Sequence, residues 1–578
     1  MKLLWCILCL NHVLALNKDW WKHSTMYEIF TPSYKDNNGD GWGDLKGIAS
    51  KLDYLKNLGI DTIYLTPYHP SPMLDMGYDV ADYYAIHPSL GTMADFDELI
   101  NQLKKRDMKL IMDLVINHSS NQHQWFKKSI ARVEPYTDYY VWRDPKGYDN
   151  NSHPIEPNNW CNIGIKSAWT WNEKRNQFYY HVFLPEQPDL NYRNPRVVRE
   201  MKKIIKFWLN KGVAGMRLDA VPWIMEDSSF EDEEPINAEN KGKKVGCLEL
   251  KREKTMNIKD TFSFLRKIRF YVDEISAKAN TLERIIILEA FGNEEQLKEY
   301  YGYYSYPSCH YVFNTIFVQQ FNYWSPSIIN SSINFWMYIT PNTSAPNWQL
   351  GNHDSLRVSF KFIQEYVNVF FTLISTLPGI MVLYYGEEIG MTLGVVRPHQ
   401  RGSFFNEFHR TPMQWDKSLS GGFSSNSKTW LPVNPNYWRI NVKEQQSKSD
   451  SVYNFIKSLL TLRKTDTFMY GDFEKIILSD WVLVIKRSYK DKMYFVVLNL
   501  ATEREKIHLD SHLPLAPEIT ALKVQLSTAN SKLKKGALVV KKKKRSFMMQ
   551  PMSSVVLSVE ENIYSFGSEH EQRDQAKE

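Results

Sequence analysis

The segments MYEIF (26–30), LKGIASKLDYLKNLG (45–59) and IDTIYLTP (60–67) set a pattern in which an apolar run, an amphipathic run and a second apolar run follow one another. DFDELINQLKKRD (95–107) and KLIMDLVINH (109–118) repeat this pattern. The amphipathic segments have helical spacing, and the apolar ones are nearly continuous, as in parallel strands buried on both faces. This part of the chain therefore predicts consecutive βαβ units.

The same alternation resumes farther along the chain, after a stretch that lacks it. Residues 119 to about 190 are irregular and rich in Asn, Trp, Pro and Tyr, which is too long for an ordinary loop and indicates a small inserted domain. The later segments are PRVVREMKKIIKFWLNKG (195–212), AGMRLDAV (214–221), RIIILEAFG (284–292), CHYVFN (309–314), NWQLGNHD (347–354) and PGIMVLYYGEE (378–388). Eight strands can be proposed, of which the sixth, near CHYVFN, is weak. We expect a closed (β/α)8 barrel, with an open doubly wound sheet as the alternative.

The C-terminal part has a different pattern. WVLVIKRSYKDKMYFVVLNL (481–500) and SSVVLSVEE (553–561) are typical of antiparallel strands. We therefore expect an α/β protein with a TIM barrel, an inserted domain B after the third strand and a C-terminal antiparallel β-sandwich. The expected boundaries are 1–15 for a signal peptide, 19–118 and 191–475 for the barrel, 119–190 for domain B, 476–565 for the β-sandwich and 566–578 for a polar tail.

Composition and charge place the chain among globular proteins. Its 578 residues are 43% hydrophobic and 24% charged, with a net charge of +6. Much of the excess charge lies in KKKKR (541–545), which we interpret as the solvated edge of a hairpin and not as a nucleic-acid patch. The N-terminus has an apolar run and a cleavage site of the form Val13-x-Ala15, and no later segment approaches the ~20 apolar residues of a membrane span. We expect a secreted, extracellular monomer or homodimer, with no nucleic-acid partner and no stable membrane insertion.

Cysteines and sequons fit an extracellular protein. Cys161, Cys247 and Cys309 remain after removal of the signal peptide. An odd number allows at most one disulfide within the chain, and the spacing does not match a cysteine-based metal site. Sequons for N-glycosylation occur at Asn117, Asn150, Asn330 and Asn342.

Polar side chains gather where the expected barrel strands end, which is where TIM barrels carry their active sites. Each one alone would more often be a helix cap or part of a structural ion pair. Together they bring carboxylates, two histidines and two arginines to one rim, which favours catalysis. They are Asp113, Asn117 and His118 after the third strand, Arg217 and Asp219 after the fourth, Glu289 after the fifth, and His353, Asp354 and Arg357 after the seventh.

This set suits glycoside hydrolysis, in which one carboxylate attacks the anomeric carbon and a protonated one donates to the leaving oxygen. Asp219 and Glu289 follow neighbouring strands and can meet the separation of about 5–5.5 Å that the retaining reaction needs. We expect Arg217 to keep Asp219 ionised, and crowding by other carboxylates to keep Glu289 protonated. Asp354 and the two histidines would hold sugar hydroxyls.

The motifs DLVINH, GMRLDAV, ILEA and GNHD resemble the four signature regions of the α-amylase superfamily, glycoside hydrolase family 13. IYLTP, MGYDVADY, QPDLN and PGIMVLYYGEE also match, and QPDLN is similar to the oligo-1,6-glucosidase and neopullulanase side of the family. The segment from DWWKHSTMYEIF to SPMLDMGYDVADY is very similar to insect α-glucosidases (maltases). The resemblance runs from about residue 19 to residue 560, with the motifs in the expected order.

The resemblance implies an exo-acting retaining α-glucosidase that hydrolyses terminal α-1,4-linked glucose from maltose, sucrose and short oligosaccharides, in a place such as the gut lumen or saliva. Domain B would wall the pocket, and Ala220 after the nucleophile implies α-1,4 preference over isomaltose. A glycan on Asn117 would obstruct that pocket, so we expect this sequon to be unmodified. The implied residues are Asp219 as nucleophile, Glu289 as general acid/base and Asp354 as transition-state stabiliser, with Tyr78, Asp79, His118, Arg217, His353 and Arg410 binding the terminal glucose.

The stretch DNNGDGWGDLKG (36–47) has oxygen-bearing side chains at alternate positions, like a calcium loop. An EF-hand needs a bidentate Glu where this chain has Gly47, so an EF-hand calcium sensor is excluded. In the related glucosidases a loop of this pattern binds a structural calcium or magnesium ion, and no organic cofactor is expected. The implied ligands are the side chains of Asp36, Asn38, Asp40 and Asp44 and the backbone carbonyl of Trp42.

Two other classes of protein resemble this fold. Amino-acid transporter heavy chains are membrane-tethered partners of a light chain, and glucosidase-like toxin receptors act by binding. The full catalytic set, and a sequence without a membrane helix or a lipid-anchor tail, favour a hydrolase. Sucrase, transglucosidase and sucrose isomerase activities stay open as alternatives, because the motifs do not separate hydrolysis from transfer.

Overall fold

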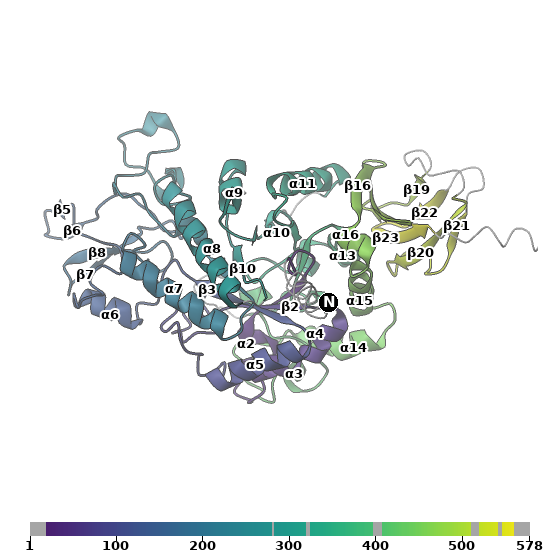
Figure 1. The fold of residues 1–578 in the computed structure, drawn as a ribbon, viewed down its shortest axis with the longest axis horizontal. Helices are drawn as coiled ribbons and strands as arrows, with labels where there is room; N and C mark the ends of the chain where they lie inside the picture. The colour runs from purple at the N-terminus through teal and green to yellow at the C-terminus, as the bar shows by residue number, and fades with distance from the viewer. Residues whose placement is uncertain are drawn as a thin grey trace, which may run out of the picture.

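The computed structural model describes residues 19–279, 282–303, 305–319, 324–396, 407–509, 519–540 and 546–559. The expected signal peptide, the KKKKR segment and the polar tail lie outside the described residues. Figure 1 shows a segment with β5 to β8 on one side of a central barrel and a C-terminal sheet on the other.

The central part is a barrel of eight parallel strands in the order β13, β10, β9, β3, β2, β1, β15, β14. Strands that follow one another in sequence are paired from β1 to β13 and from β14 to β15, and the last strand pairs with the first, unlike in a doubly wound sheet. The strands β13 and β14 stand at the two ends of this order. The TIM barrel is confirmed, and the weak sixth strand is present as the two-residue β13. The bounds are β1 Thr25–Ile29, β2 Thr62–Leu65, β3 Lys109–Val115, β9 Gly215–Asp219, β10 Ile285–Leu288, β13 Tyr311–Val312, β14 Asn347–Trp348 and β15 Ile380–Tyr384.

Two asparagines close the barrel between the short strands β13 and β14. Asn347 Nδ2 donates to the Val312 carbonyl at 2.7 Å, and the Asn314 backbone N–H donates to Asn347 Oδ1 at 2.8 Å. Asn314 Nδ2 donates in turn to the Asn347 carbonyl at 3.0 Å. These buried side chains therefore satisfy backbone groups that a strand ladder would otherwise pair.

Helices cover the outside of the barrel, and α7 shows why the sequence forms them. Asn194 caps the helix by accepting from the Arg196 N–H, Pro195 fits the first turn, and an apolar stripe that includes Met201 and Trp208 is buried. The helices of this part are α2 Thr31–Tyr34, α3 Leu45–Ser50, α4 Leu52–Leu58, α5 Met93–Lys105, α7 Pro195–Asn210, α8 Lys259–Ala279, α9 Glu294–Tyr301, α10 Ile316–Gln319, α11 Pro326–Ile339, α12 Val358–Lys361, α13 Gln364–Thr376, α14 Val442–Ser447, α15 Val452–Arg463 and α16 Asp466–Tyr470.

The segment inserted after β3 has a small core of its own. Trp160, Trp169, Phe178 and Tyr180 pack together there, apart from the barrel core. The elements are α6 Gln124–Ile130, a three-stranded antiparallel sheet of β4 Trp142–Arg143, β8 Gln177–Tyr180 and β7 Trp169–Asn172, and a hairpin of β5 Gly147–Tyr148 and β6 Pro154–Ile155. This arrangement is that of the expected domain B.

A disulfide connects the inserted segment to a second excursion from the barrel. It joins Cys161 to Cys247, and Cys247 lies in the stretch between β9 and α8. Cys309 is a buried free thiol, and burial raises its pKa to about 12. The single disulfide that the odd cysteine count allows is therefore present, and it ties two barrel insertions together.

The C-terminal part is an antiparallel β structure with a separate core, which includes Val484, Phe495 and Leu557. Its main sheet has the order β16, β17, β18, β23, β20, β21, and β19 pairs with β22 in a second sheet. Helix α13 packs against β18 and β23, and Thr372 and Ser554 hydroxyls hydrogen-bond at 2.8 Å. The bounds are β16 Asp472–Ile477, β17 Val482–Tyr489, β18 Lys492–Asn499, β19 Glu505–His508, β20 Ala521–Ser527, β21 Leu538–Val540, β22 Ser546–Met549 and β23 Ser553–Val559. A short hairpin of β11 (Gly302–Tyr303) and β12 (Tyr306–Pro307) follows α9.

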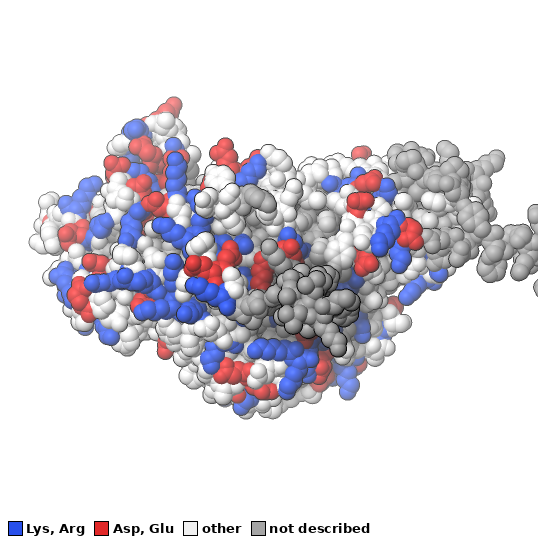
Figure 2. Space-filling model, viewed as in Figure 1, with Lys and Arg blue, Asp and Glu red and all other residues white. Residues whose placement is uncertain are grey.

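The charge on the surface and the apolar character of the helices are relevant to the nucleic-acid and membrane partners considered above. On the face shown in Figure 2, basic and acidic side chains are interspersed over the barrel helices. Among the residues that the structure describes, no helix combines the length and the apolar character needed to cross a membrane.

Candidate active site

A cavity of about 250 Å³ opens at the carboxyl ends of the barrel strands. Its polar lining comes from strand ends and nearby loops, and its apolar lining includes residues of the inserted segment. The lining residues are Asp75, Tyr78, His118, Ile163, Phe183, Asp219, Ala220, Trp223, Glu289, Phe291, Asp354 and Arg410. The three expected catalytic carboxylates therefore meet at one cavity.

Arg217 on β9 connects the acidic groups of this cavity. Its Nη1 lies 2.8 Å from Asp113 Oδ1 and 2.5 Å from Asp219 Oδ1, and its Nη2 lies 2.9 Å from Glu289 Oε1. Arg217 and Asp219 are two residues apart on one strand, so their side chains point to the same face. Glu289 Oε2 also accepts from the Ala220 N–H at 3.0 Å, which fixes its orientation. The nucleophile and acid candidates are thus held by a common guanidinium.

The protonation of Asp219 differs from the sequence-based expectation. Burial raises its pKa well above the usual range, Arg217 lowers it, and the neighbouring Glu289 and Asp113 carboxyl groups raise it further. A side-chain hydrogen bond with Glu289 contributes to the rise. Arg217 opposes the rise without cancelling it, because its one guanidinium is divided among three carboxylates in a buried place.

Asp354, the third carboxylate of the cavity, is held by two cations. Arg410 Nη2 lies 2.7 Å from Asp354 Oδ1, and His353 Nε2 lies 3.1 Å from Asp354 Oδ2. Burial opposes ionisation of Asp354, but His353 and Arg410 outweigh it and lower its pKa far below the usual range. Asp354 is therefore a fixed carboxylate in this site.

Tyr78 connects the two sides of the cavity. Its hydroxyl donates to Asp113 Oδ2 at 2.7 Å and lies 2.7 Å from His353 Nε2, and its ring stacks on His353. Burial lowers the pKa of His118 to about 3, so this imidazole is neutral, and its Nε2 lies 3.1 Å from the Tyr78 carbonyl. Asn117 beside it is fully buried, which supports the expectation of an unmodified sequon.

The structure does not bring Asp79 to the cavity. Asp79 is fully buried and accepts from the Ser71 hydroxyl at 2.6 Å and from the Leu74 and Asp75 N–H groups at 3.1 and 3.2 Å. It therefore shapes the loop, and Asp75 is the carboxylate of that loop which lines the cavity. Burial raises the pKa of Asp75 to about 7, with Arg410 and a hydrogen bond from Gln187 opposing the rise. We correct the expectation for Asp79 accordingly.

Apolar residues on this cavity escaped the sequence reasoning. Phe183 packs edge-on against Trp223, and Trp223 lies next to Phe291. Only Phe291 carried a signal, since it follows Glu289 in the motif at the end of β10, whereas Ile163 and Phe183 lie in the irregular inserted segment. Asp75 carried a signal too, because it directly precedes the MGYDVADY motif.

The loop expected to bind a metal ion is closed by its own hydrogen bonds. Asp36 accepts from the Gly39 and Gly41 N–H groups at 2.7 and 2.8 Å, and Asp44 accepts from the Asn37 N–H at 2.7 Å. Asp40 and Asn38 bond each other at the exposed tip. Within the described part of the chain, no group of three or more His, Cys, Asp or Glu side chains is arranged to hold a metal ion. The buried Asp36 and Asp44 fit a hard cation only in part.

Comparison with known proteins agrees with this geometry. Residues 28–471 match the family model described as alpha amylase, catalytic domain. The chain is 37% identical to an alpha-glucosidase of Culex pipiens, over 93% of this chain and 91% of that protein, and 36% identical to a salivary alpha-glucosidase of Anopheles gambiae, over 93% of each. The crystal structure of the trehalulose synthase MutB from Pseudomonas mesoacidophila superposes with a TM-score of 0.77 and 29% identity, over 94% of this chain and 99% of that one.

A protein named for another role is also similar. The human amino acid transporter heavy chain SLC3A1 is 36% identical over 88% of this chain and 74% of its own length. The family match covers most of the chain and contains the barrel from the end of β1 onward, the inserted segment and every polar residue of the cavity. The chain therefore belongs to the α-amylase family of glycoside hydrolases.

Proposed function

We propose that the protein is an exo-acting retaining α-glucosidase that removes terminal α-linked glucose from maltose, sucrose and short oligosaccharides. The observation that carries the proposal is the position of Arg217, whose guanidinium lies 2.5 Å from Asp219 and 2.9 Å from Glu289. Two carboxyl groups on one guanidinium are held close together, as the retaining reaction needs. The small cavity suits a single terminal sugar better than the middle of a long chain.

In the first step, a carboxylate oxygen of Asp219 forms a bond to the anomeric carbon while the bond from that carbon to the leaving oxygen breaks. Glu289, as the acid, delivers a proton to the leaving oxygen, so the aglycone departs neutral and Glu289 becomes a carboxylate. Asp219 is left as the glucosyl ester. Arg217, which contacts both groups, stays in place as the charge moves from one to the other.

In the second step, Glu289 takes a proton from a water molecule whose oxygen bonds to the anomeric carbon. The ester bond breaks, Asp219 leaves as a carboxylate, and glucose is released with its configuration retained. A sugar hydroxyl in place of the water would give transfer. The ratio of hydrolysis to transfer therefore depends on what the mouth of the cavity admits.

The other side of the cavity would bind the sugar hydroxyls. Asp354 is held ionised by His353 and Arg410, so it can accept hydrogen bonds that strengthen as the ring flattens toward the transition state. Asp75 lines the same cavity and, with a pKa of about 7, is available as donor or acceptor near neutral pH. His118 and Tyr78 complete this side.

Linkage preference is proposed from Ala220. It lines the cavity directly after Asp219 and has a φ of 53°, in the left-handed region. A β-branched residue is less easily placed there, and it would also narrow the space beside the reacting carbon. We infer a preference for α-1,4 linkages over isomaltose. Secretion is proposed on the likeness to salivary alpha-glucosidases.

The experiment is to express the chain and measure glucose release from maltose, sucrose, isomaltose and p-nitrophenyl α-glucoside, with Asp219→Asn alongside. We expect activity of the wild type on maltose and a loss of about 10⁴-fold or more in the variant. If wild type and variant are equally inactive on all four compounds, the function is a different one, such as the binding role of a transporter heavy chain. A preference for isomaltose would contradict the inference from Ala220.

A further inference from the structure

One loop of the inserted segment lines two cavities. In this loop, residues 159–167, Ile163 lines the active-site cavity, whereas Cys161 and Ile165 line a second cavity of about 1160 Å³. Ile163 is 39% exposed, so it has few neighbours to hold its side chain against the active site. The loop therefore has room to move away from the active-site cavity. Its position depends on the bonds that attach it to the rest of the protein.

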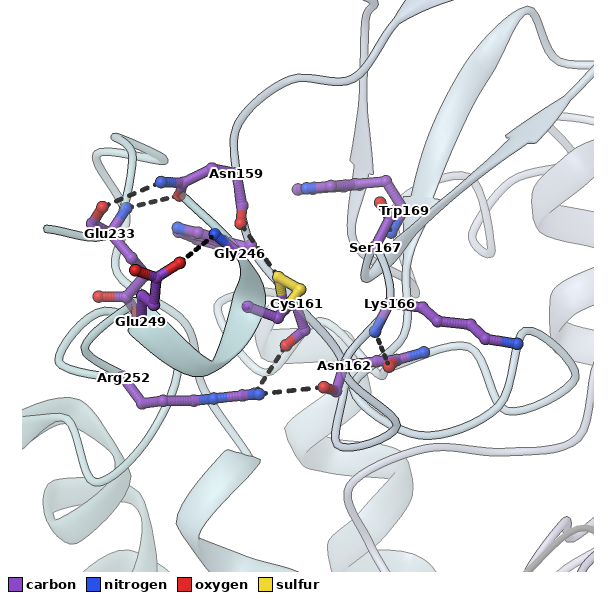
Figure 3. The surroundings of a disulfide bond; sticks show 12 residues. Asn159, Cys161, Asn162, Lys166, Ser167, Trp169, Glu233, Gly246, Glu249 and Arg252 are labelled. Atoms are coloured by element: carbon purple, nitrogen blue, oxygen red, sulfur yellow. Dashed lines mark hydrogen bonds between the residues drawn. A yellow bond between two sulfur atoms is a disulfide. The ribbon is translucent and has the colours of Figure 1, made fainter. Parts of the chain in front are cut away.

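The bonds that hold this loop come from the stretch between β9 and α8, which we call the excursion. The disulfide joins Cys161 to Cys247, and Arg252 reaches the same loop with both of its terminal nitrogens (Figure 3). Arg252 Nη1 donates to the Cys161 carbonyl at 2.7 Å, and Nη2 donates to the Asn162 carbonyl at 3.0 Å. The disulfide and the Arg252 guanidinium thus fix Cys161 and Asn162, the two residues that precede Ile163.

The same excursion holds the beginning of the loop. Asn159 Nδ2 donates to the Glu233 carbonyl at 2.9 Å, and the Glu233 N–H donates to Asn159 Oδ1 at 2.7 Å. The Glu233 carboxylate in turn accepts from the Lys254 N–H at 2.9 Å and the Thr255 hydroxyl at 2.9 Å, close to the start of α8. The excursion is therefore itself anchored and can act as a fixed support.

Ties from the rest of the inserted segment are fewer. The Ile163 N–H donates to the Val182 carbonyl at 2.9 Å, Asn162 Nδ2 donates to the Phe183 carbonyl at 3.4 Å, and the Ala168 N–H donates to the Trp160 carbonyl at 2.9 Å. The remaining turn is closed within itself by Asn162 and Lys166. Near Ile163, which is partly exposed, such hydrogen bonds are easily exchanged for bonds to water. The disulfide is the one covalent link among these ties, so it has the largest effect on where the loop can go.

We propose that the Cys161–Cys247 disulfide is a positioning device that sets the selectivity of the active site for the leaving group by holding Ile163 at the cavity. The proposal rests on the proposed function. The strand ends with Asp219, Glu289 and Asp354 form the floor, which receives the terminal glucose. Ile163 lines the same cavity from the inserted segment and not from a strand end, so we place it against what is attached to the glucose.

The test compares two substrates in the wild type and in Cys161→Ser/Cys247→Ser. Maltose has a sugar as leaving group, which reaches Ile163, whereas α-glucosyl fluoride has a single atom, which does not. We expect kcat/KM for maltose to fall about fivefold or more in the double variant, and kcat/KM for the fluoride to stay within about twofold. An equal fall for both substrates, or no change for either, would overturn the proposal.

Further variants test whether the disulfide acts through Ile163. Ile163→Ala with the disulfide intact should give the same selective loss, and adding the double serine change to it should cause little further loss for maltose. If the losses in kcat/KM for maltose from the two changes were fully additive, the disulfide would act on selectivity by a route that does not involve Ile163. Ile163→Ala also decides the matter if the double variant does not fold, since an unaltered maltose-to-fluoride ratio in it contradicts the proposal.

A control with a reducing agent distinguishes an effect of this disulfide from an effect of the free thiol of Cys309. Mild reduction of the folded wild type should change the maltose-to-fluoride ratio, while the double serine variant should not respond, and Cys309→Ala should respond like the wild type. A response of the double serine variant would assign the effect to Cys309 and overturn the proposal. A wild type inactive on both substrates would instead refute the proposed function, which this experiment therefore distinguishes.

Discussion

Glu28 on the first barrel strand accepts two hydrogen bonds from His353, which lies 325 residues later in the chain. The His353 backbone N–H is 3.0 Å and its Nδ1 is 2.7 Å from the same oxygen, Glu28 Oε1. Burial would lower the pKa of this imidazole, but Asp354 and Glu28 raise it to about 10. His353 is thus an imidazolium that links the barrel interior to Asp354.

The first prediction concerns the alkaline limb of activity. Because its folded pKa lies above the usual 6.5, the imidazolium contributes stability fully below pH 6.5 and loses it as the pH rises through about 10. Glu28→Gln removes a negative charge at 2.7 Å, so we expect the pKa of His353 and the alkaline limb of kcat/KM to move down by about one pH unit or more. The surface variant Asp53→Asn is the control. An unmoved limb in Glu28→Gln would show that His353 does not set it.

The second prediction separates the two carboxyl groups that contact Arg217. A fluoride leaving group needs little protonation, so Glu289→Gln should lose about 10²–10⁴-fold in kcat/KM on maltose and much less in kcat/KM on α-glucosyl fluoride. The comparison uses kcat/KM because kcat also includes the second step, in which Glu289 acts as the base for both substrates. Asp219→Asn should lose activity on both, because it removes the nucleophile. Equal losses on maltose and fluoride in Glu289→Gln would contradict its assignment as the acid.

The barrel and the polar strand ends were predictable because they obey local rules. The strands are buried on both faces and read as nearly continuous apolar runs, and Asp219 and Glu289 directly follow two of them. Strand β13 has only two residues, so its sequence signal was weak, and its seam with β14 depends on side chains of Asn314 and Asn347 that no periodicity reveals.

The cavity wall was not predictable in the same way. Ile163 and Phe183 lie in the irregular insertion, and their position depends on a disulfide to a residue in another insertion. The choice between Asp75 and Asp79 also needed the backbone, since the turn between them decides which carboxylate faces the cavity and which one accepts the loop's own N–H groups. The raised pKa of Asp219 depends on burial, which the sequence does not display.

The third prediction distinguishes these two aspartates. Because burial raises the pKa of Asp75 to about 7, ionising it costs stability progressively as the pH rises from about 4 to 7. Asp75→Asn should therefore lower kcat/KM on maltose and leave the melting temperature at pH 7.5 unchanged or raised by about 2–4 °C. Asp79→Asn should lower the melting temperature, since it weakens a carboxylate that accepts from Ser71 and from two backbone N–H groups. The measurements are the melting temperature and kcat/KM on maltose of both variants. If Asp79→Asn lowered kcat/KM and Asp75→Asn lowered the melting temperature, Asp79 would again be the sugar ligand.

The fourth prediction concerns the loop of residues 36–44, where we propose a calcium or magnesium ion. Asp36 and Asp44 are 2% and 3% exposed. The nearby Lys35 ammonium donates to backbone carbonyls. A metal ion can therefore still offset the negative charge of the two aspartates. The ion would need Asp36 and Asp44 to exchange N–H partners for the metal, with the Trp42 carbonyl, Asn38 and Asp40 completing the ligands. At a hundredfold excess over its Kd, a bound ion stabilises the fold by about 2.7 kcal/mol, which is an increase of roughly 2 °C in the melting temperature of a chain of this length. Chelation should therefore lower the melting temperature of the wild type and not that of Asp44→Asn, while activity on maltose at 25 °C stays the same. If neither chelation nor added calcium moves the melting temperature, the loop is held by its own hydrogen bonds alone.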